Sequence, residues 1–597
     1  MAIHSAQRDT LKPRLEAALA TMRHRGPDGD GTWLSSSAGI GLGSVRLAVM
    51  GVENGRQPLA NESGNIHAVV NGEFYDFERL RGDLQTRGHV FLTSSDSELL
   101  VHLYEEHGLD CLRHLRGEFA FVLWDDANRR FIAARDRFGI KPLNFARIDG
   151  EWIFASEIKA IIAAGIEPRW DEVTFLHCLA YQYSRPDETL FAGVSQIKPA
   201  HVMVIENDTA HEVCYWQPSF EPDSIITAAD VRAALEESVR LRMRSDVPMA
   251  CTLSGGLDSS AVAAISGVRD CFCVRFDAEG YDEGTLVLAD AAAHQRVHEV
   301  RVTRSDLIMH LTAAVRQSEG LAINGQLVGK FLLSRAIHDA GFKVVLAGEG
   351  ADEAFLGYSH LQQDYTQIHA AFALQRGVML PAEGESATWS TPAWLDRLPT
   401  FLQAKLSTGR HLADLTREPF DSQRILDGAL ADIGVIRGSL VRQSAWLWTR
   451  MALAGYILRT LGDGAEMAHS VEARLPFLDH VLFELAAKIP AESLIDRDHT
   501  KLMLRESLRG LLPEKVRSRP KHPFLSPPLE SDPAVRDFIR DTMHSTACRS
   551  LPLLDHRAVL AWTDDLDTLS ASARARLDPV LMLLLTATLL NQTYSLS

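Results

Sequence analysis

The chain has 597 residues. This length exceeds what a single hydrophobic core usually supports, so we expect two large domains. Apolar residues make up 46% of the sequence and charged residues 23%, a balance that excludes an intrinsically disordered chain. The formal net charge of −17 argues against a surface for nucleic acid or an anionic membrane, because phosphate binding needs a basic patch.

Short strands and turn signals dominate the first third of the chain. Asp125–Asn128 separates two apolar runs and Asp149-Gly150 separates another two, so both are predicted to be hairpin turns. Helices are predicted over Asp76–Arg87 and Ser97–His107, since a glycine follows each segment. This mixture predicts an α+β domain with antiparallel sheets.

A polar stretch with two prolines, Gln217–Ile226, is predicted to be a linker. It divides the chain into a first domain over residues 1–215 and a second over residues 227–597. A helix over Ala228–Arg244 opens the second domain. Apolar strands alternating with helices follow it, and the strands are Val247–Leu253, Cys271–Phe276 and Phe342–Ala347. The alternation predicts a parallel sheet in an α/β domain.

From about residue 360 to its end the chain is predicted to be mostly helical. The most apolar stretch, Pro579–Leu590, is shorter than the roughly 20 residues that span a bilayer, so we expect a buried bundle helix. The N-terminus lacks a basic segment followed by an apolar core, so it is not a secretory signal. Seven dispersed cysteines suit a reducing cytoplasm, and Cys271 and Cys273 are predicted to lie in a buried strand.

Ser254–Ser260 (SGGLDSS) lies between a strand of the buried type and a helix. Glycines let the backbone approach phosphates, hydroxyls donate hydrogen bonds, and a helix N-terminus adds a positive dipole. A strand-to-helix turn can carry Ser and Gly without binding anything, but a run of seven residues with five Ser or Gly around an acid disfavours that alternative. The segment is predicted to bind an anion, and it is not a Walker A loop because it lacks G-K-[ST].

This loop resembles the pyrophosphate-binding loop of ATP pyrophosphatases, the group that includes asparagine, GMP and NAD synthetases. Further segments resemble asparagine synthetase in particular: Asp282-Glu283, Leu346–Tyr358, Gly462–Asp479 and Lys501–Arg505. Segments of the first domain resemble that family's glutamine amidotransferase domain: Arg23–Gly29, Asn71–Glu73, Arg135–Leu143 and Ala155–Lys159. The resemblance runs, in order, from about residue 10 to about residue 530.

The resemblance implies an N-terminal-nucleophile-type α+β domain with antiparallel sheets. An α/β ATP pyrophosphatase domain with a parallel sheet and a helical C-terminal part would follow it. It implies an amide ligase that uses ATP and Mg²⁺, releases AMP and pyrophosphate, and takes nitrogen from glutamine or ammonia. The acceptor would be a small carboxylate, aspartate or an analogue, and no nucleic acid or membrane is expected as a partner. The oligomeric state stays open, a homodimer included.

The same resemblance assigns roles to individual residues. Asp258 and Asp352 would bind Mg²⁺, Glu349 would lie beside the reacting carboxyl group, and Lys501 would offset phosphate charge. A buried lysine paired with an acid would also fit a structural role. The implied ATP-binding residues are Leu253, Ser254, Gly255, Gly256, Asp258, Ser259, Ser260, Val274 and Gly348. The implied glutamine-binding residues are Arg46, Asn71, Gly72, Glu73 and Asp96.

The N-terminus departs from the family pattern. The family's amidotransferase begins at a cysteine whose thiol attacks glutamine and whose free α-amine can act as the base. Here the second residue is Ala2, and no cysteine occurs before Cys111. Apolar residues at helical spacing over Leu11–Met22 predict a helix directly before Arg23–Gly29, so the strand that starts at the cysteine is predicted to be missing. Either the natural chain starts upstream or the glutaminase is inactive.

Two alternatives to an asparagine synthetase remain. The first is a same-fold enzyme with another acceptor, of the β-lactam-forming or lasso-peptide-closing kind, and Leu321–Lys330 carries no aspartate-specific signature. Glu349 argues against a β-lactam-forming enzyme, because those relatives have a tyrosine at the matching position. The second alternative is an inactive partner-binding pseudoenzyme, which the joint retention of Asp258, Glu349, Asp352 and Lys501 disfavours.

Overall fold

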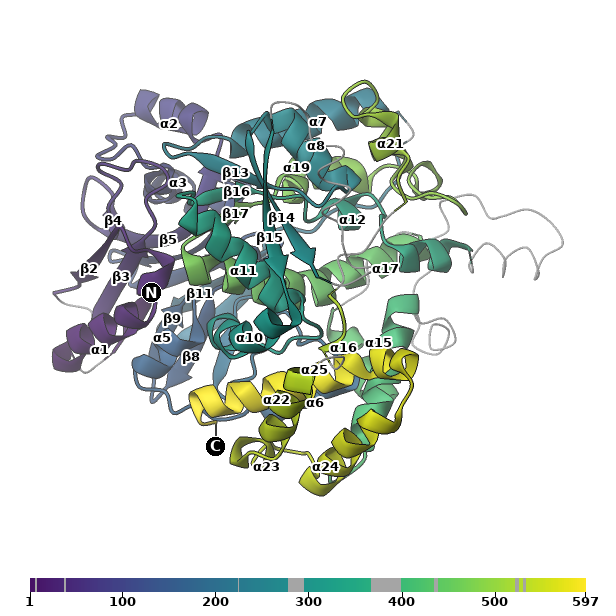
Figure 1. The fold of residues 1–597 in the computed structure, drawn as a ribbon. Coiled ribbons are helices and arrows are strands. Elements are labelled where there is room, and N and C mark those ends of the chain that lie inside the picture. Colours follow the sequence, from purple (N-terminus) through teal and green to yellow (C-terminus); the bar gives the residue numbers. More distant parts are fainter. Residues whose placement is uncertain are drawn as a thin grey trace.

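The structure is a computed structural model that describes most of the chain (Figure 1). The residues left out are 6–7, 37–38, 224, 278–294, 367–398, 434–438, 521–525, 530–532 and 597. Asp282-Glu283, one of the segments that resembles a family motif, therefore lies outside the described residues. In Figure 1 the N-terminal third lies on one side, the parallel sheet lies centrally, and the C-terminal helices lie below it.

The N-terminal third contains two six-stranded antiparallel sheets, which confirms the predicted class. The first sheet, ordered β10-β8-β9-β1-β3-β2, has strands β1 (Ala2–His4), β2 (Gly29–Leu34), β3 (Ile40–Arg46), β8 (Asn144–Ile148), β9 (Glu151–Ala155) and β10 (Val194–Gln196). The second, ordered β12-β11-β7-β6-β5-β4, has strands β4 (Leu59–Ala60), β5 (Ile66–Tyr75), β6 (Arg116–Asp125), β7 (Arg130–Arg135), β11 (His201–Glu206) and β12 (Thr209–Cys214). The predicted hairpins β6–β7 and β8–β9 are both present.

The two sheets pack face to face and helices cover their outer faces. Apolar residues of both sheets, such as Phe154 and Phe131, share the core between them. The covering helices are α1 (Arg8–Thr21) and α5 (Ile158–Ala163) on the first sheet, and α2 (Phe77–Thr86) and α3 (Leu99–His107) on the second. The domain therefore has four layers: helices, first sheet, second sheet and helices. Both faces of each sheet are covered, so polar residues lie at the sheet edges and strand ends.

Strand β1 shows that the prediction of a missing first strand was wrong. Ala2 and Ile3 are fully buried, and β1 pairs antiparallel with β3 on one side and with β9 on the other. Three residues are too few to display the two-residue period of a strand, so the sequence pattern did not reveal it. Helix α1 follows as predicted, and Met1 stands directly ahead of the strand.

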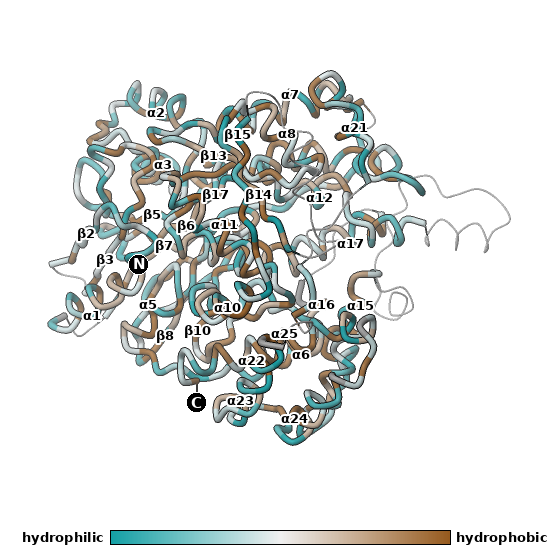
Figure 2. Tube along the Cα trace, in the orientation of Figure 1, coloured by the Kyte–Doolittle hydropathy of each residue, from teal (hydrophilic) through white to brown (hydrophobic). Residues whose placement is uncertain are grey.

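A five-stranded parallel sheet forms the centre of the second region, as the strand–helix alternation predicted. Its order is β15-β14-β13-β16-β17, and its strands are β13 (Met249–Thr252), β14 (Asp270–Phe276), β15 (Arg296–Val302), β16 (Val344–Leu346) and β17 (Glu472–Arg474). Helices near this sheet are α7 (Ala228–Arg242), α8 (Leu257–Ser266) and α11 (Gln326–Asp339). Apolar residues run along the central strands (Figure 2), and Cys271 and Cys273 are buried in β14 as predicted.

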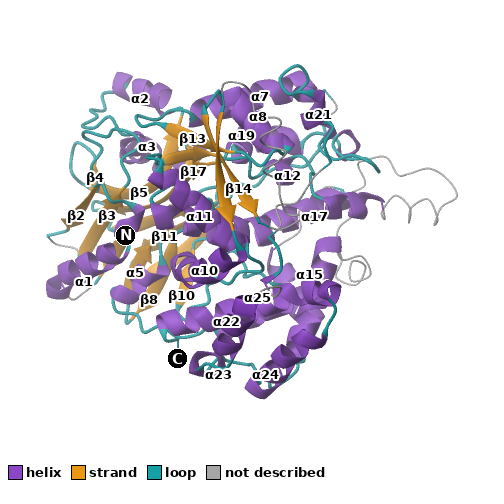
Figure 3. Cartoon of the chain, in the orientation of Figure 1, coloured by secondary structure: helices purple, strands orange, loops and turns teal. Residues whose placement is uncertain are grey.

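The C-terminal part is helical, as Figure 3 shows. Its longest helix, α25 (Ala571–Tyr594), contains the predicted bundle segment Pro579–Leu590 and is buried along it. Its neighbours are α10 (Arg304–Ser318), α15 (Thr400–Ala413), α22 (Pro533–Met543) and α23 (Thr546–Arg549). Helix α6 (Glu172–Tyr181), from the N-terminal third, packs against α15. Within the described ranges, no helix has both the length and the apolar character needed to cross a bilayer.

Buried ion pairs join the two regions. Arg25 Nη1 lies 2.6 Å from Asp463 Oδ2, and Arg242 Nε lies 2.8 Å from Glu118 Oε1. All four side chains are at most 7% exposed. Removing one partner of such a pair leaves an uncompensated buried charge, which is strongly destabilising. The pairs therefore hold the N-terminal domain against the parallel-sheet domain.

Candidate active sites

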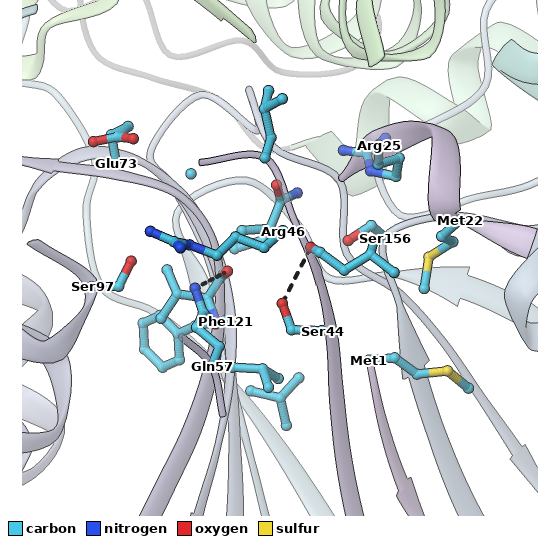
Figure 4. A pocket seen from close by; sticks show the side chains of 18 of the residues that line it. Met1, Met22, Arg25, Ser44, Arg46, Gln57, Glu73, Ser97, Phe121 and Ser156 are labelled. Carbon is cyan, nitrogen blue, oxygen red and sulfur yellow. Dashed lines mark hydrogen bonds between the residues drawn. The ribbon is translucent and has the colours of Figure 1, made fainter. Parts of the chain in front are cut away.

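A small pocket in the N-terminal third contains all five residues predicted to bind glutamine. The cavity has a volume of about 110 Å³, and its lining includes residues of β3, β5 and the parallel-sheet domain. Figure 4 shows Arg46 crossing it, with Glu73 and Ser97 on one side and Met1 and Ser156 on the other. The predicted residues that line it are Arg46, Asn71, Gly72, Glu73 and Asp96.

Donors for a ligand are held in place at this pocket. Arg46 Nη2 donates to the carbonyl oxygens of Met50 (3.1 Å) and Gly51 (2.6 Å), which fixes the guanidinium. The Nδ2 atom of Asn71 is buried and makes no hydrogen bond to any described residue, so it has a donor to offer. Gly72 has φ of +118°, and a Cβ there would collide with the Glu118 carbonyl oxygen, so only glycine fits.

Two acids, Asp96 and Glu73, also line this pocket. Burial raises the pKa of Asp96 to about 6, although the Phe74 N–H donates to its Oδ2 at 2.6 Å. Burial, followed by the charge of Asp96, raises the pKa of Glu73 well above its usual range, and Arg474 opposes this from 3.2 Å. Two carboxylates and the Arg46 guanidinium are groups that would hold the α-amine and the α-carboxylate of an amino acid.

Met1 belongs to the same pocket. Its α-amine donates to the Gly43 carbonyl oxygen at 2.7 Å, and burial lowers the pKa of this amine to about 5. The amine is therefore mostly neutral at pH 7 and can accept a proton. The Met1 side chain is a thioether, which cannot act as a thiol nucleophile. A chain that starts at Met1 thus presents no thiol here, while the strand and pocket around it are intact.

The larger pocket lies at the carboxyl ends of the central parallel strands, the usual ligand position in such sheets. Its volume is about 480 Å³. Leu253 directly follows β13, Val274 lies on β14, and Gly348 follows β16. The predicted residues that line it are Leu253, Ser254, Asp258, Ser259, Val274, Gly348, Glu349 and Asp352.

The loop residues Gly255, Gly256 and Ser260 do not line this cavity. Gly256 precedes the first turn of α8, and the Ser260 N–H is used inside that helix, bonding the Gly256 carbonyl at 3.2 Å. Ser259 Oγ accepts from the Ser254 N–H at 3.1 Å, which shapes the loop. The N-cap residue of α8 is Gly256, which has no side chain to cap the helix, so its first N–H groups remain available to an anion.

Lys501 joins the two acids predicted to bind metal. Its Nζ lies 2.7 Å from Asp258 Oδ1 and 2.6 Å from Asp352 Oδ1. These acids come from α8 and from α12 (Ala351–Ala354), the helices that follow β13 and β16. The two loop segments predicted to bind the nucleotide therefore meet at one buried ammonium group.

A second acid of α12 lies next to this cluster. The hydroxyl of Tyr358 donates to Glu353 Oε1 at 2.8 Å, and Trp448 Nε1 donates to the same oxygen at 3.1 Å. Burial, followed by the charge of Asp352, raises the pKa of Glu353 to about 7. Glu353 is thus held by two donors beside Asp352, and it lines the larger pocket although the sequence did not single it out.

The backbone at Lys501 is unusual as well. Lys501 is 2% exposed and stands directly before α20 (Leu502–Ser507) with φ of +56°, a left-handed conformation that is uncommon for a residue other than glycine. Gly357 packs so closely on Lys501 that a Cβ there would collide with its side chain. Strained backbone of this kind concentrates at functional sites. The position thus holds one buried cation against two carboxylates.

Glu349 forms an ion pair with Lys330, beside Glu466, that the sequence did not predict. Lys330 Nζ donates to Glu349 Oε1, and Lys330 and Glu466 both line the same cavity. Burial raises the pKa of Glu466 to about 8, although the Lys330 charge lowers it, so Glu466 is mostly protonated at pH 7. Lys330 lies in the segment Leu321–Lys330 and Glu466 in the motif segment Gly462–Asp479, but only the fold brings them to Glu349.

The two pockets share a wall. Met467 lines both of them, and Glu472 of β17 lines the smaller one from the parallel-sheet domain. Arg474, also on β17, reaches Glu73 of the smaller pocket. A single short strand and the residues before it therefore lie between the two cavities.

Comparisons with known proteins agree with this arrangement. A family model described as asparagine synthase matches residues 230–589, and one described as a glutamine amidotransferase domain matches residues 1–216. The glutamine-hydrolysing asparagine synthetase 3 of Bacillus subtilis is 31% identical, over 86% of this chain and 84% of its own length. Amidase chry2 of Gibberella zeae is 32% identical, over 86% and 85%. Amidase chyE of Penicillium rubens is 32% identical, over 88% and 86%.

Proposed function

The chain belongs to the asparagine synthase family, and from that premise we propose that it is an ATP-dependent ligase that turns a carboxylate into an amide. The observation that carries the proposal is the convergence of Asp258, Asp352 and Lys501 beside an uncapped helix N-terminus. Two acids that can hold a metal ion and a lysine at such a loop suit a bound nucleoside triphosphate. Aspartate or an analogue is the proposed acceptor.

The reaction has two halves. A carboxylate oxygen attacks the α-phosphorus of ATP, and the bond to the bridging oxygen breaks, so that pyrophosphate leaves. The loop from Ser254 to Ser259 would hold the phosphates, and Lys501 would offset the charge that develops on them. Ammonia then attacks the acyl carbon, loses a proton, and AMP leaves with the electrons of the C–O bond. Glu349 is the proposed acceptor of that proton.

Mg²⁺ is the cofactor that this chemistry implies. Asp258 and Asp352 fit it, because their carboxylates already converge on one cationic centre, the Lys501 ammonium, and Mg²⁺ prefers carboxylate oxygens. When bound, the ion would neutralise phosphate charge.

The adenosine would lie against Leu253, Val274 and Gly348. A Cβ on Gly348 would come within 2.9 Å of the Ser259 nitrogen, which explains why this position is a glycine.

The smaller pocket would supply the nitrogen. Arg46, Asn71, Gly72, Glu73 and Asp96 are proposed to bind glutamine, and ammonia would pass to the larger pocket along the shared wall at Met467. Free ammonium would serve the second half-reaction directly, because that step depends only on the parallel-sheet domain.

Release of pyrophosphate tests the proposal. The purified chain is mixed with ATP, Mg²⁺, ammonium and one acid at a time from a panel of aspartate, glutamate and larger carboxylic acids. We expect release with at least one acid, and release with aspartate alone would identify an asparagine synthetase. Release with none of them would contradict a ligase and favour an inactive partner-binding subunit.

Replacing Lys501 should slow the first half-reaction. We expect Lys501→Ala to reduce pyrophosphate release by at least ~100-fold, the usual effect of losing one partner of transition-state charge. Lys501→Arg should restore little, because a planar guanidinium does not reproduce a compact ammonium. Lys343→Ala, which removes a partly exposed lysine paired with Asp28, is the matched control. Near-normal release by Lys501→Ala would show that Lys501 is only structural.

A further inference from the structure

Two histidines and two glutamates converge on the outer face of the second sheet, away from both pockets. They are Glu62, His89, His102 and Glu105, and each offers one ligand atom within 4.8 Å of the others. None of the four lines either cavity. The group combines imidazole nitrogens with carboxylate oxygens, the ligand types that transition metals bind in proteins.

Three separate segments bring these side chains together. Glu62 lies in the turn after β4, and His89 follows Gly88, whose φ of +103° turns the chain back after α2. His102 and Glu105 are three residues apart on α3 and therefore share one face of that helix. The cluster thus ties together a turn, a loop and a helix that are separate in sequence.

The Nδ1 atoms of the two histidines face the glutamates. His102 Nδ1 lies 3.4 Å from Glu62 Oε2. His89 Nδ1 lies 3.6 Å from Glu62 Oε1 and 3.7 Å from Glu105 Oε2. These separations between ligand atoms are those expected around one small ion with bonds of roughly 2.0–2.2 Å.

The opposite ring nitrogens face two further carboxylates. His89 Nε2 lies 3.0 Å from Glu106 Oε1, and His102 Nε2 lies 3.5 Å from Glu98 Oε1. Histidines that bind metal commonly donate their other N–H to a carboxylate, which orients the ring and strengthens the ligand. His89 therefore has such an outer hydrogen bond, and the His102 ring has a carboxylate beside its outer nitrogen.

His102 provides an independent indication of a ligand. Its side chain is 0% exposed, and its ring nitrogens lie 3.4 Å from Glu62 and 3.5 Å from Glu98 without meeting hydrogen-bond geometry to any described residue. A buried polar group without a hydrogen bond costs free energy, so such a group calls for a partner. A metal ion at Nδ1 would supply that partner.

We propose that Glu62, His89, His102 and Glu105 bind one Zn²⁺ ion. Four nitrogen and oxygen ligands from the protein match the closed, tetrahedral coordination of structural zinc, whereas Ca²⁺ and Mg²⁺ prefer oxygen ligands only. The ion ties the segment after Gly88 to α3. That segment leads to Asp96, and Glu98 already accepts from the backbone N–H groups of Leu92 and Thr93, each at 2.6 Å.

Zinc titration of the 597-residue chain, first stripped of transition metals, tests the proposal. Excess Mg²⁺ is kept present, so that Asp258 and Asp352 do not compete for zinc. We expect one Zn²⁺ per chain by calorimetry and elemental analysis. Co²⁺ in place of Zn²⁺ should give the visible absorption of a tetrahedral site, and hydrogen exchange of the segment from Val90 to Asp96 should slow when metal is added.

Variants locate the site. His89→Gln, which changes the less deeply buried of the two histidines, should abolish the Co²⁺ absorption, and Glu105→Gln should weaken zinc binding. Glu106→Gln, which changes only an outer partner, should weaken it by about 10-fold to 100-fold. His114→Gln removes an exposed histidine of the same domain and should change nothing. Undiminished binding in His89→Gln, or no zinc bound by the unaltered chain, would overturn the proposal.

Discussion

Asp258→Ala should abolish adenylate formation, and Asp352→Ala should do the same. Each carboxylate is proposed to hold Mg²⁺ against the phosphates, so each loss should lower the rate by about 10²–10³-fold or more. Isotope exchange between pyrophosphate and ATP, in the presence of an accepted carboxylate, reports this step alone. The loss of pyrophosphate–ATP exchange should be far larger than any decrease in the fraction of folded protein.

The fold needs a separate check, because Asp258 and Asp352 also neutralise buried Lys501. Asp258→Asn keeps the side-chain volume while removing the charge, and circular dichroism with thermal unfolding shows whether each variant is folded. Asp270→Asn is the control, since Asp270 begins β14 and pairs with His298 at the opposite end of the sheet. Normal exchange in a folded Asp258 or Asp352 variant would show that the metal assignment is wrong.

The sequence predicted the main architecture because its signals there are local. The hairpin turn at Asp125–Asn128 is readable from its own residues, and so is the buried segment Pro579–Leu590 of α25. Strands β13, β14 and β16 were predicted from short apolar runs. These runs are buried between helices in a parallel sheet, which is why they lack a polar alternation.

The strands that the sequence missed are stabilised by distant partners. β17 consists of Glu472, Ala473 and Arg474, and its buried charges are compensated because Arg474 pairs with Glu472 and with Glu73 of the other domain. β15 reads RVHEVRV, with charged residues that are exposed at the sheet edge. Neither pattern indicates burial by itself. β1 was predicted to be absent because three residues carry no readable period.

The candidate sites also divide into features with a local sequence signal and features that depend on contacts between distant segments. The loop from Ser254 to Ser260 was predicted from its own composition, and the structure brings Asp258 to Asp352 across α8 and α12. The pairing of Lys330 with Glu349, and the nearby Glu466, could not be predicted, because no local spacing connects these positions. Chemistry carried by one segment is readable from sequence, whereas chemistry shared between segments needs the fold.

Met1→Cys should give a polypeptide that starts at position 1 the ability to hydrolyse glutamine. A polypeptide that starts at Met1 carries a thioether in the smaller pocket and cannot form a thioester. Because β1 is present, no upstream strand has to be added, in contrast to what the sequence indicated. A cysteine at position 1, exposed by removing a preceding methionine, would place thiol and amine on one residue ahead of β1.

The pocket around position 1 is what makes the gain of activity expected. Arg46, Asn71, Glu73 and Asp96 line the cavity with Met1, and burial holds the pKa of the Met1 amine at about 5. That amine is deprotonated at pH 7 and can accept the thiol proton, so activity should fall as the pH drops through about 5. Glutamate release and amide product are measured with glutamine and, separately, with ammonium.

The control variants distinguish three functions: the nucleophile at position 1, glutamine binding in the smaller pocket and amide formation in the larger pocket. Met1→Ser should stay nearly inactive with glutamine, and Met1→Cys combined with Asp96→Asn should bind glutamine poorly. All variants should form amide from ammonium at the same rate, because that step uses the larger pocket. Glutamine hydrolysis by the unaltered polypeptide would overturn the assignment of position 1, and a folded Met1→Cys variant without glutaminase activity would show that the smaller pocket does not bind glutamine. Turnover with an amine-bearing acid but not with ammonium would instead identify a cyclase-like enzyme of this family.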